Sequence, residues 1–336
     1  MTIAVPHALI TARRQVEPAL RAAVGELDEH TRRVCEYHFG WVHADGSPDG
    51  RTGKALRPAL VLLTAQAVAD GPAPQAEAAA VELVHNFSLL HDDLMDDDTS
   101  RRHRPTAWTV FGRPAALLAG DALLALGTTV LVGTGRPHAA EAVRTLGAAT
   151  GQLIVGQAAD LGFERRHDVE LDEALRMVEG KTAALLGCAC ALGALAAGGD
   201  AEAVSRMRGF GVELGMAFQL VDDLLGLWGD PGTTGKPVLS DLRARKKTVP
   251  VVHALGSGTP EGERLQGLLQ APEPLVGDRA ELAADLVRRA GSAAWAEAEC
   301  ERRLDAALAQ LRTGGRSGPA VDALTELAEF IVRRKW

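Results

Sequence analysis

Two short acidic segments carry the residue types in this chain that are most able to do chemistry. The first, residues 91–98, contains a histidine and five aspartates. On a helix, His85, Asp92 and Asp96 share a face, because residues seven and eleven apart are close to two and three full turns. Asp93 lies between the two aspartates in the sequence. Carboxylates four residues apart destabilise a helix unless cations lie between them, and hard oxygen ligands of this kind suit Mg²⁺, which also binds phosphate oxygens.

The second acidic segment, residues 218–226, places two adjacent aspartates inside an apolar stretch. Gln219, Asp222 and Asp223 fall on one broad helical face. Buried carboxylates are costly unless they are paired or bound to a metal ion. Gly226 stands where a third carboxylate would repeat the spacing of the first segment. Alone, the first segment could be a solvated helix end and the second a structural ion pair, but their pairing favours metal binding.

Basic residues near the expected ends of helices could hold anions. Arginine forks and lysine ammonium groups both suit phosphate oxygens. Each of these residues alone is typical of an ordinary surface charge. Together with two carboxylate segments they describe a site for two polyanions and several cations. The basic residues are Lys54, Arg57, Arg101, Arg102, Lys181 (followed by Thr182), Lys236 and Lys246.

The elements that position these residues are predicted to be helices. Helical periodicity recurs from about residue 8 to the C-terminus, strong helix formers dominate, and aromatic residues are only 4% of the chain, which argues against a β-sandwich or barrel. We expect roughly ten helices in a single all-α domain over residues 1–336. The expected breaks, rich in polar residues, glycine or proline, are residues 43–52, 70–74, 100–105, 133–137, 163–168, 198–200, 229–237, 256–260 and 313–319.

The bulk properties exclude several classes of function. A net charge of −8 does not attract nucleic acid through the overall field. The four cysteines fit neither a zinc motif nor a dense disulfide framework, so we expect buried free thiols in a reducing cytosol. The first residues lack a signal-peptide pattern, and the apolar stretches are too short for a confident membrane span. We therefore expect a cytoplasmic protein without stable membrane insertion.

Two other motifs are partial matches only. Residues 229–236 are similar to a nucleotide-binding loop, but Asp230 takes the first glycine position and Pro237 replaces the Ser/Thr that follows the lysine. His91 with Asp92 is similar to the His-Asp pair of metal phosphohydrolases. That reading leaves the second aspartate pair and the basic groups unexplained.

The two acidic segments and the basic groups resemble those of the trans-isoprenyl diphosphate synthases, the family of farnesyl and geranylgeranyl diphosphate synthases, in its actinobacterial form. The resemblance runs from about residue 50 to the C-terminus. It implies one large orthogonal helix bundle of the isoprenoid synthase type around a central cavity. It also implies a homodimeric transferase that condenses isopentenyl diphosphate with allylic diphosphates head to tail, using Mg²⁺, with three ions expected.

The resemblance also implies a role for each matching residue. Asp92, Asp96, Asp222 and Asp223 match metal ligands, with Asp93 beside the first. Arg101, Lys181 and Lys236 match contacts to the allylic diphosphate, and Lys246 matches a later loop lysine. Lys54, Arg57, His85 and Arg102 match the isopentenyl diphosphate pocket. Thr182, Gln157 and Gln219 match polar residues at the reacting centre, and Gly156 with Asp160 fits the family's central helix.

The chain departs from the family pattern at two positions. Gly226 replaces the usual third aspartate of the second motif, and His103 stands where a glycine usually follows the arginine pair. In the family, the residues four and five before the first aspartate often set product length. Here these are Ser88 and Phe87, which favour a twenty-carbon product, with fifteen carbons next.

Two alternatives remain open beside this reading. A class I terpene cyclase on the same fold would use similar magnesium chemistry, but it would not need the pocket residues Lys54, Arg57 and His85. A non-catalytic partner subunit of a related synthase is suggested by Gly226, while the intact first motif speaks against it.

Overall fold

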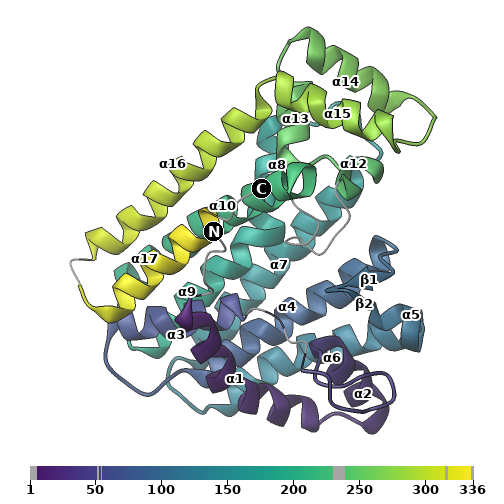
Figure 1. The fold of residues 1–336 in the computed structure, drawn as a ribbon. Coiled ribbons are helices and arrows are strands. Elements are labelled where there is room, and N and C mark those ends of the chain that lie inside the picture. The colour runs from purple at the N-terminus through teal and green to yellow at the C-terminus, as the bar shows by residue number, and fades with distance from the viewer. Residues whose placement is uncertain (1–5, 51–52, 54, 230–238, 315–316, 334–336) are drawn as a thin grey trace. The chain divides into compact units, whose positions relative to one another are not determined.

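The chain is almost entirely helical. A computed structural model describes residues 6–50, 53, 55–229, 239–314 and 317–333 (Figure 1). In that part of the chain, extended structure is limited to an isolated bridge between Val42 and Pro48 and to the hairpin of β1 (Ser100–Arg101) and β2 (Arg104–Pro105). The all-α prediction is confirmed, and most of the expected breaks fall between helices.

The described residues form more helices than the roughly ten expected. Those before residue 135 are α1 (His7–Gly25), α2 (Glu29–Phe39), α3 (Leu56–Val68), α4 (Gln75–Met95), α5 (Ala107–Phe111) and α6 (Arg113–Gly133). They are followed by α7 (Ala139–Phe163), α8 (Leu171–Val178), the π-helical turn η1 (Glu179–Ala183), α9 (Ala184–Ala196) and α10 (Ala201–Trp228). The last are α12 (Ser240–Arg243), α13 (Val249–Leu255), α14 (Pro260–Gln270), α15 (Asp278–Arg289), α16 (Ser292–Thr313) and α17 (Pro319–Val332).

The chain divides into two compact units, each built from three separate segments. Unit 1 comprises Met1–Thr150, Leu185–Arg208 and Leu311–Leu327, and unit 2 comprises Gly151–Ala184, Gly209–Gln310 and Ala328–Trp336. The first acidic segment belongs to unit 1 and the second to unit 2. A single domain over the whole chain stays a prediction.

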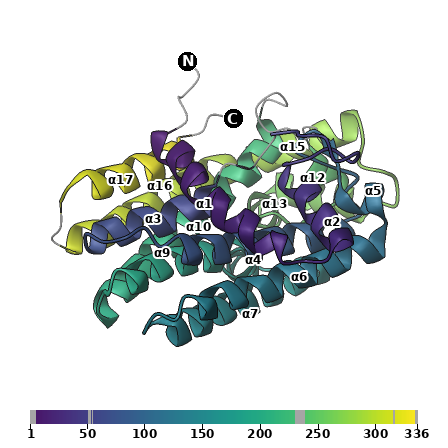
Figure 2. The ribbon, with the colours of Figure 1, turned by 90° about the horizontal axis from the view of Figure 1, so that it is seen from below.

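Unit 1 is organised around α4. Ala78, Val81, Leu83 and Val84 of this helix are all completely buried, as expected for a helix that is apolar on every side. It packs against α1, α3 and α6, and Figures 1 and 2 both show it running alongside α6. The last turn of this buried helix carries the first aspartates, so the acidic residues rest on a rigid element.

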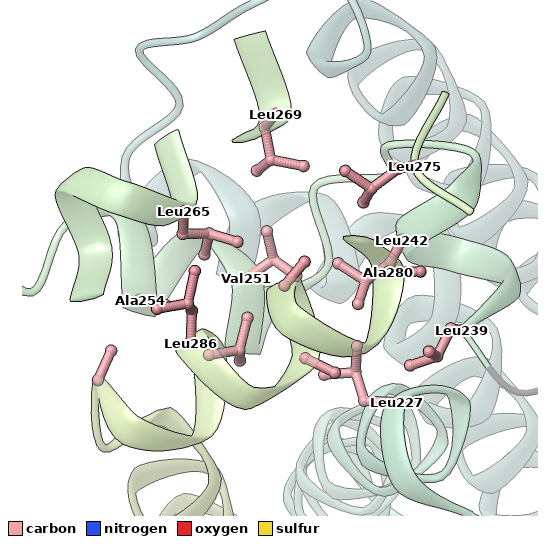
Figure 3. Packing of buried hydrophobic residues seen from close by; sticks show 14 residues of the cluster. Leu227, Leu239, Leu242, Val251, Ala254, Leu265, Leu269, Leu275, Ala280 and Leu286 are labelled. Carbon is pink, nitrogen blue, oxygen red and sulfur yellow. The ribbon is translucent and has the colours of Figure 1, made fainter. Parts of the chain in front are cut away.

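Unit 2 has a hydrophobic cluster where the end of α10 meets α12 to α15. Leu227 of α10 packs with Leu239 and Leu242 around α12 and with Val251 of α13, all less than 8% exposed (Figure 3). Helix α15 covers the cluster through Ala280 and Leu286. Burial of such side chains contributes about 25 cal/mol per Å² of apolar surface, which stabilises the packing of α12, α13 and α15 against the end of α10.

The helix that carries Lys181 contains a π-turn where it meets α7. At η1 the backbones approach so closely that a Cβ at Gly156 would lie 2.2 Å from the nitrogen of Lys181. A Cβ at Gly180 would lie 2.7 Å from the carbonyl oxygen of Gln152. Only glycine fits at both positions. π-turns inside helices occur often at functional sites, and this one contains both Lys181 and Thr182.

The structure bears on two expectations about compartment. All four cysteines are free and buried, as predicted. Two helical stretches, Arg113–Gly133 and Leu171–Ala196, are long and apolar enough to cross a membrane by length and composition alone. In the second stretch, 78% of the apolar 18-residue window is buried within the protein, which is typical of a core helix. Core helices also meet these criteria of length and composition.

Candidate active site

The first acidic segment ends α4 and is tied to β1 by one arginine. Arg101 donates from Nε to Oδ1 of Asp93 over 2.6 Å and from Nη2 to Oδ2 of Asp92 over 3.4 Å. Its guanidinium also lies 3.9 Å from Asp98. Asp92 and Asp96 are partly exposed. The turn thus holds Asp93 inward against Arg101 and leaves Asp92 and Asp96 partly exposed, each with one carboxylate oxygen, Oδ1, buried.

Asp93 is the buried member of this segment. Its side chain is 1% exposed, and its Oδ2 atom forms no hydrogen bond within the described residues. Burial raises the pKa of Asp93 to about 6, and the charge of Arg101 opposes that shift. Asp93 therefore anchors Arg101, while Asp92 and Asp96 are the carboxylates better placed for an ion.

The hairpin that follows reverses the chain through two left-handed residues. Arg102 has φ +53° and His103 has φ +59°, between the paired residues Arg101 and Arg104. Positive φ at both central positions is typical of a type I′ turn, which strongly favours glycine or asparagine. The glycine that the family usually carries at this position thus has a conformational reason. In this chain His103 adopts the positive φ that glycine would favour.

The hairpin brings Arg102 against the segment that opens α3. A Cβ at Gly53 would lie 2.9 Å from Nη2 of Arg102. Arg57 belongs to the first turn of α3. It follows Lys54 by three residues in the sequence. Lys54 and Lys236 lie outside the described residues. Arg102 therefore lies beside Gly53 in unit 1, and the isopentenyl diphosphate pocket stays a prediction.

Arg57 and Arg102 influence the pKa values of two buried groups on α4. Burial raises the pKa of Glu82, and the charges of Arg57 and Arg102 oppose that shift. Burial and the same two arginines hold the pKa of His85 well below its ordinary value, so His85 is a neutral donor or acceptor. Sequence reasoning missed Glu82, although its position three residues before His85 on a helix places both on one face.

A small cavity beside Asp93 is strongly basic. It is lined by His38 of α2 and by Arg101, Arg102 and Arg104 of the hairpin. Burial and these three arginines hold the pKa of His38 well below its ordinary value, and its Nε2 atom is buried without a hydrogen bond in the described structure. The cluster suits an anion, and the sequence offered no signal for His38.

In unit 2 a chain of hydrogen bonds runs through the second acidic motif. Thr182 of η1 donates to Oε1 of Gln219 over 2.8 Å, and Nε2 of Gln219 donates to Oδ1 of Asp223 over 2.9 Å. The backbone nitrogen of Val249 donates to Oδ2 of Asp223 over 3.1 Å. Both carboxylate oxygens of Asp223 are therefore engaged in holding α10, η1 and α13 together.

Asp223 is buried, and within the described part of the chain no arginine forms an ion pair with it. It is 5% exposed. Burial raises the pKa of Asp223 to about 8, the hydrogen bond from Gln219 lowers it, and the carboxylate of Asp241 raises it further. Asp222, by contrast, is exposed. Of the two aspartates in this motif, Asp222 is the one that faces outward.

The π-turn positions a lysine and an amide in unit 2. Nζ of Lys181 donates to Oδ2 of Asp160 over 2.5 Å, which orients the ammonium group. Gln157, one turn before Asp160 on α7, is 7% exposed, and its Nε2 atom is buried without a hydrogen bond among the described residues. Lys246 follows α12 and is partly buried. The structure thus places Lys181 on η1, paired with Asp160, and Gln157 on α7, and their roles at the reacting centre stay predictions.

The two residues expected to set product length belong to α4. Phe87 is 6% exposed and places its ring edge on to His91, with centroids 4.8 Å apart. His91 in turn lies 3.0 Å from the carbonyl oxygen of Leu117 on α6. Ser88 is partly buried and donates to the carbonyl oxygen of His85. Phe87 is therefore held in one place by its neighbours.

Comparison with known proteins identifies the class to which this arrangement belongs. Residues 50–286 match the polyprenyl synthetase family. The chain is 46% identical over 335 residues to the (2E,6E)-farnesyl diphosphate synthase of Mycobacterium tuberculosis, covering 98% of this chain and 91% of the relative. It is also 46% identical over 320 residues to a geranylgeranyl diphosphate synthase of the same organism, covering 94% and 91%.

Solved structures agree with the sequence comparison. The polyprenyl synthetase of Streptomyces coelicolor A3(2) superposes with a TM-score of 0.90 at 45% identity, covering 98% of this chain and all of that one. A geranylgeranyl pyrophosphate synthetase of Pyrococcus horikoshii gives 0.85 at 29% identity, covering 98% of each chain. The chain belongs to the polyprenyl synthetase family and has its helical-bundle fold. It is a prenyltransferase of the short-chain isoprenyl diphosphate synthase type, as the sequence predicted.

The family depends on divalent metal ions, and the outward carboxylates fit that need. Among the described residues, no group of three or more His, Cys, Asp and Glu side chains is arranged to hold an ion. Mg²⁺ does not require such a cage, because it keeps several waters and takes one or two carboxylates together with substrate phosphate oxygens. Asp92 and Asp96 in unit 1, and Asp222 in unit 2, suit that mode of binding.

Proposed function

We propose that this enzyme condenses isopentenyl diphosphate with allylic diphosphates head to tail and releases geranylgeranyl diphosphate as its main product, with farnesyl diphosphate next. The observation that carries the proposal is the arrangement in unit 1, where two partly exposed carboxylates, an arginine hairpin and a neutral buried histidine lie on and beside one buried helix. We propose that both units serve this reaction as one catalytic domain.

The roles of the side chains in unit 1 follow from their chemistry. Asp92 and Asp96 would hold Mg²⁺ against the allylic diphosphate, and Arg101, fixed by Asp93, would donate to the same group. Arg57, His85 and Arg102, with Lys54, would bind isopentenyl diphosphate. A neutral His85 can accept or donate a hydrogen bond without adding charge to that pocket.

Unit 2 would act on the allylic partner. Lys181 and Lys236 would donate to its diphosphate, with Lys246 nearby, while Asp222 would hold a further Mg²⁺. Asp223 was also predicted as a ligand. Its two hydrogen bonds favour a positioning role instead, in which it fixes Gln219 and Thr182 beside the reacting carbon, with Gln157 as a further polar neighbour.

When bound, three Mg²⁺ ions would supply charge stabilisation at the departing diphosphate. The protein contributes cationic donors at the same leaving group and an apolar surround that keeps water from the allylic cation. The double bond of isopentenyl diphosphate then attacks the allylic carbon, and a proton is lost to the released diphosphate. No protein nucleophile is required, in agreement with the chemistry of the residues present.

Product analysis tests the function directly. Purified protein with Mg²⁺, isopentenyl diphosphate and each allylic primer is expected to give twenty-carbon diphosphate as the main product by mass spectrometry. Farnesyl diphosphate supplied alone is expected to stay unchanged. A hydrocarbon formed without isopentenyl diphosphate would support a terpene cyclase, and inactivity combined with activation of a related synthase would support a partner subunit.

Phe87 provides a test of product length. Phe87→Ala removes a buried ring that the neighbouring His91 contacts edge on, so the space for the growing chain deepens and we expect products longer by one or more five-carbon units. Phe87→Leu keeps most of the bulk and is the matched control. An unchanged product profile in Phe87→Ala would assign this residue to core packing alone.

We also propose that the enzyme is a cytoplasmic homodimer. The support is α6, which is strongly apolar yet leaves Leu117, Leu118 and Val132 between 47% and 61% exposed. Exposed apolar faces often mark interfaces, and most oligomers are symmetric assemblies of identical chains. We therefore propose that a second copy of this chain covers the exposed apolar residues of α6. Light scattering is expected to give twice the mass of one chain, and Leu118→Glu is expected to reduce it.

A further inference from the structure

One histidine joins α4 to α6 beside the first acidic motif. His91 immediately precedes Asp92, and its side chain is 18% exposed. Its Nε2 atom lies 3.0 Å from the carbonyl oxygen of Leu117 on α6. Because a carbonyl oxygen only accepts, Nε2 is the donor of this hydrogen bond. The end of α4 is therefore tied to the neighbouring helix through the imidazole ring.

The space for this ring exists because residue 120 is glycine. A Cβ at Gly120 would overlap the Nε2 and Cδ2 atoms of His91 and would lie 3.4 Å from its Cε1 atom. Gly120 is itself buried on α6. Since protein interiors are close-packed, a larger residue at position 120 would push the imidazole ring out of its place.

The same two helices pack differently two turns further along α6. Gly127 follows Gly120 by seven residues, so the two glycines share one face of the helix. A Cβ at Gly127 would lie 3.0 Å from Cγ2 of Val84 and 3.2 Å from the carbonyl oxygen of Ala80. Near Gly127 the close neighbours on α4 are thus an apolar side chain and the backbone, whereas near Gly120 the close neighbour is the polar ring of His91.

The ring of His91 also supports Phe87. The two residues are four apart on α4, so they are neighbours on one face of the helix. Their rings meet edge to face, with centroids 4.8 Å apart and an angle of 70° between the planes. This is a favoured arrangement of aromatic rings. Removal of the imidazole would leave the Phe87 ring without its neighbour on that side and with space to move into.

From these contacts we infer that His91 is a positioning residue for product length: seated over Gly120 and bonded to Leu117, it fixes the ring of Phe87, which limits the space for the growing chain. The inference rests on the proposed function and on the role proposed there for Phe87. It adds to that role a contact from a second helix. A contribution of His91 to folding alone is the competing explanation.

The test measures product length rather than rate. Purified full-length protein is incubated with Mg²⁺, isopentenyl diphosphate and farnesyl diphosphate, and the products are quantified by mass spectrometry. We expect His91→Ala to raise the share of products longer than the wild type's main product about tenfold, a factor that one methylene in an apolar pocket can supply. Asp121→Asn is the matched control. It removes an exposed partner 3.6 Å from His91, keeps both ring contacts and should leave the product profile unchanged.

Refilling the space from α6 separates the volume of the ring from other effects. In the double variant His91→Ala with Gly120→Leu, the leucine side chain enters the space that the imidazole vacates. We expect the share of longer products to return to within about threefold of wild type. Gly120→Leu alone overpacks the same space and should lower the melting temperature. Longer products that persist in the double variant would overturn the inference.

A second cycle tests whether His91 acts through Phe87. In a Phe87→Ala background the ring that His91 supports is absent, so adding His91→Ala is expected to change the product lengths less than about twofold. An equal lengthening by His91→Ala in both backgrounds would show that the two residues act independently, which contradicts a positioning role.

The remaining outcomes separate this inference from the proposed function. Absence of any prenyl product from the wild type would overturn the proposed function itself. An active wild type with an unchanged profile in His91→Ala would overturn the role of His91 and leave the function standing. Melting temperatures show whether each variant is folded. Where His91→Ala does not fold, His91→Gln, which keeps a donor but loses the ring, takes its place, and the same two results decide.

Discussion

The two acidic motifs differ in how they compensate the charge of a buried aspartate. Each has a buried aspartate behind an outward one. In unit 1, Asp93 is paired with Arg101, and its pKa rises only to about 6. In unit 2, the donors to Asp223 among the described residues are the neutral groups of Gln219 and Val249, and its pKa rises to about 8.

The difference shows where each motif takes its compensating charge. An arginine supplied by the chain balances the first motif, so that this end of α4 is organised before any ion arrives. The second motif has Asp222 and Asp241 beside a buried carboxyl group, and its neutral hydrogen bonds add no positive charge. We therefore expect the second motif to depend on cations for its organisation and the first to depend on them mainly for the reaction.

The largest expected effect comes from the outward carboxylate of the first motif. Asp92→Asn is expected to lower kcat about 10³-fold, or about 4 kcal/mol, because it removes charge stabilisation at the leaving group. Asp222→Asn is expected to cost about 10²-fold, because it removes the exposed carboxylate of the second motif. Steady-state kinetics with saturating Mg²⁺ measure both.

Asp97 provides the control for that prediction. It belongs to the same acidic run, but it is 71% exposed and pairs with Arg113. Asp97→Asn removes the same charge and should leave kcat within about twofold, because a surface pair contributes little. Equal losses in Asp92→Asn and Asp97→Asn would mean that the run acts only through its overall charge.

The next largest effect tests the arginine that distinguishes the two motifs. Arg101→Gln leaves Asp93 buried without its cation, which we expect to lower the free energy of unfolding by about 3 kcal/mol at pH 8. The loss should be smaller at pH 5, where Asp93, with a pKa of about 6, already carries a proton. Urea unfolding without metal ions measures it. Arg113→Gln, which breaks an exposed pair, should cost less than about 1 kcal/mol, and an equal loss at both pH values would contradict the account.

The sequence predicted the elements that carry the acidic residues but not the contacts between them. Helical periodicity and the aspartate spacing place Asp92 on α4 and Asp222 on α10, because both depend on local repeats. The break before Asp28 was missed, although Asp28 caps α2 by accepting from His30 and Thr31, a signal that N-cap preferences could have revealed.

Other features depend on distant segments and leave no local signal. The π-turn at Lys181 forms where Gly156 and Gly180 bring two backbones together. Asp241 reaches Gly226 through a turn set by the buried leucines around it. Hydrogen bonding of Asp223 to Val249 joins residues on separate helices. Such contacts arise from tertiary packing, which periodicity and spacing do not report.

A smaller effect compares the buried carboxyl groups through pH. A raised pKa in the folded state means that the unfolded state ionises first, so stability is complete below pH 4 and falls as pH rises. Asp93→Asn removes this loss. Relative to that variant, the wild type should lose about 2–3 kcal/mol between pH 4 and 6 and no more above.

The same comparison made with Asp223→Asn should show a loss of stability that extends to higher pH. With a pKa of about 8 for Asp223, the loss of wild-type stability relative to the variant continues from pH 4 to about pH 8. Urea unfolding of metal-free protein at several pH values measures both windows. Identical windows for the two variants would remove the distinction between an arginine-compensated and an uncompensated motif.

The smallest effect concerns the left-handed turns that follow the two motifs. His103 at φ +59° is on an exposed hairpin, whereas Leu239 at φ +64° is buried. His103→Gly is expected to raise the free energy of unfolding by about 0.5–1 kcal/mol, because glycine adopts positive φ without strain. Leu239→Gly relieves the same strain but removes a buried side chain, and it should destabilise the protein by about 2 kcal/mol or more. The two substitutions are therefore expected to change the melting temperature in opposite directions, and a shared direction would mean that the turn after the second motif is not held by its hydrophobic cluster.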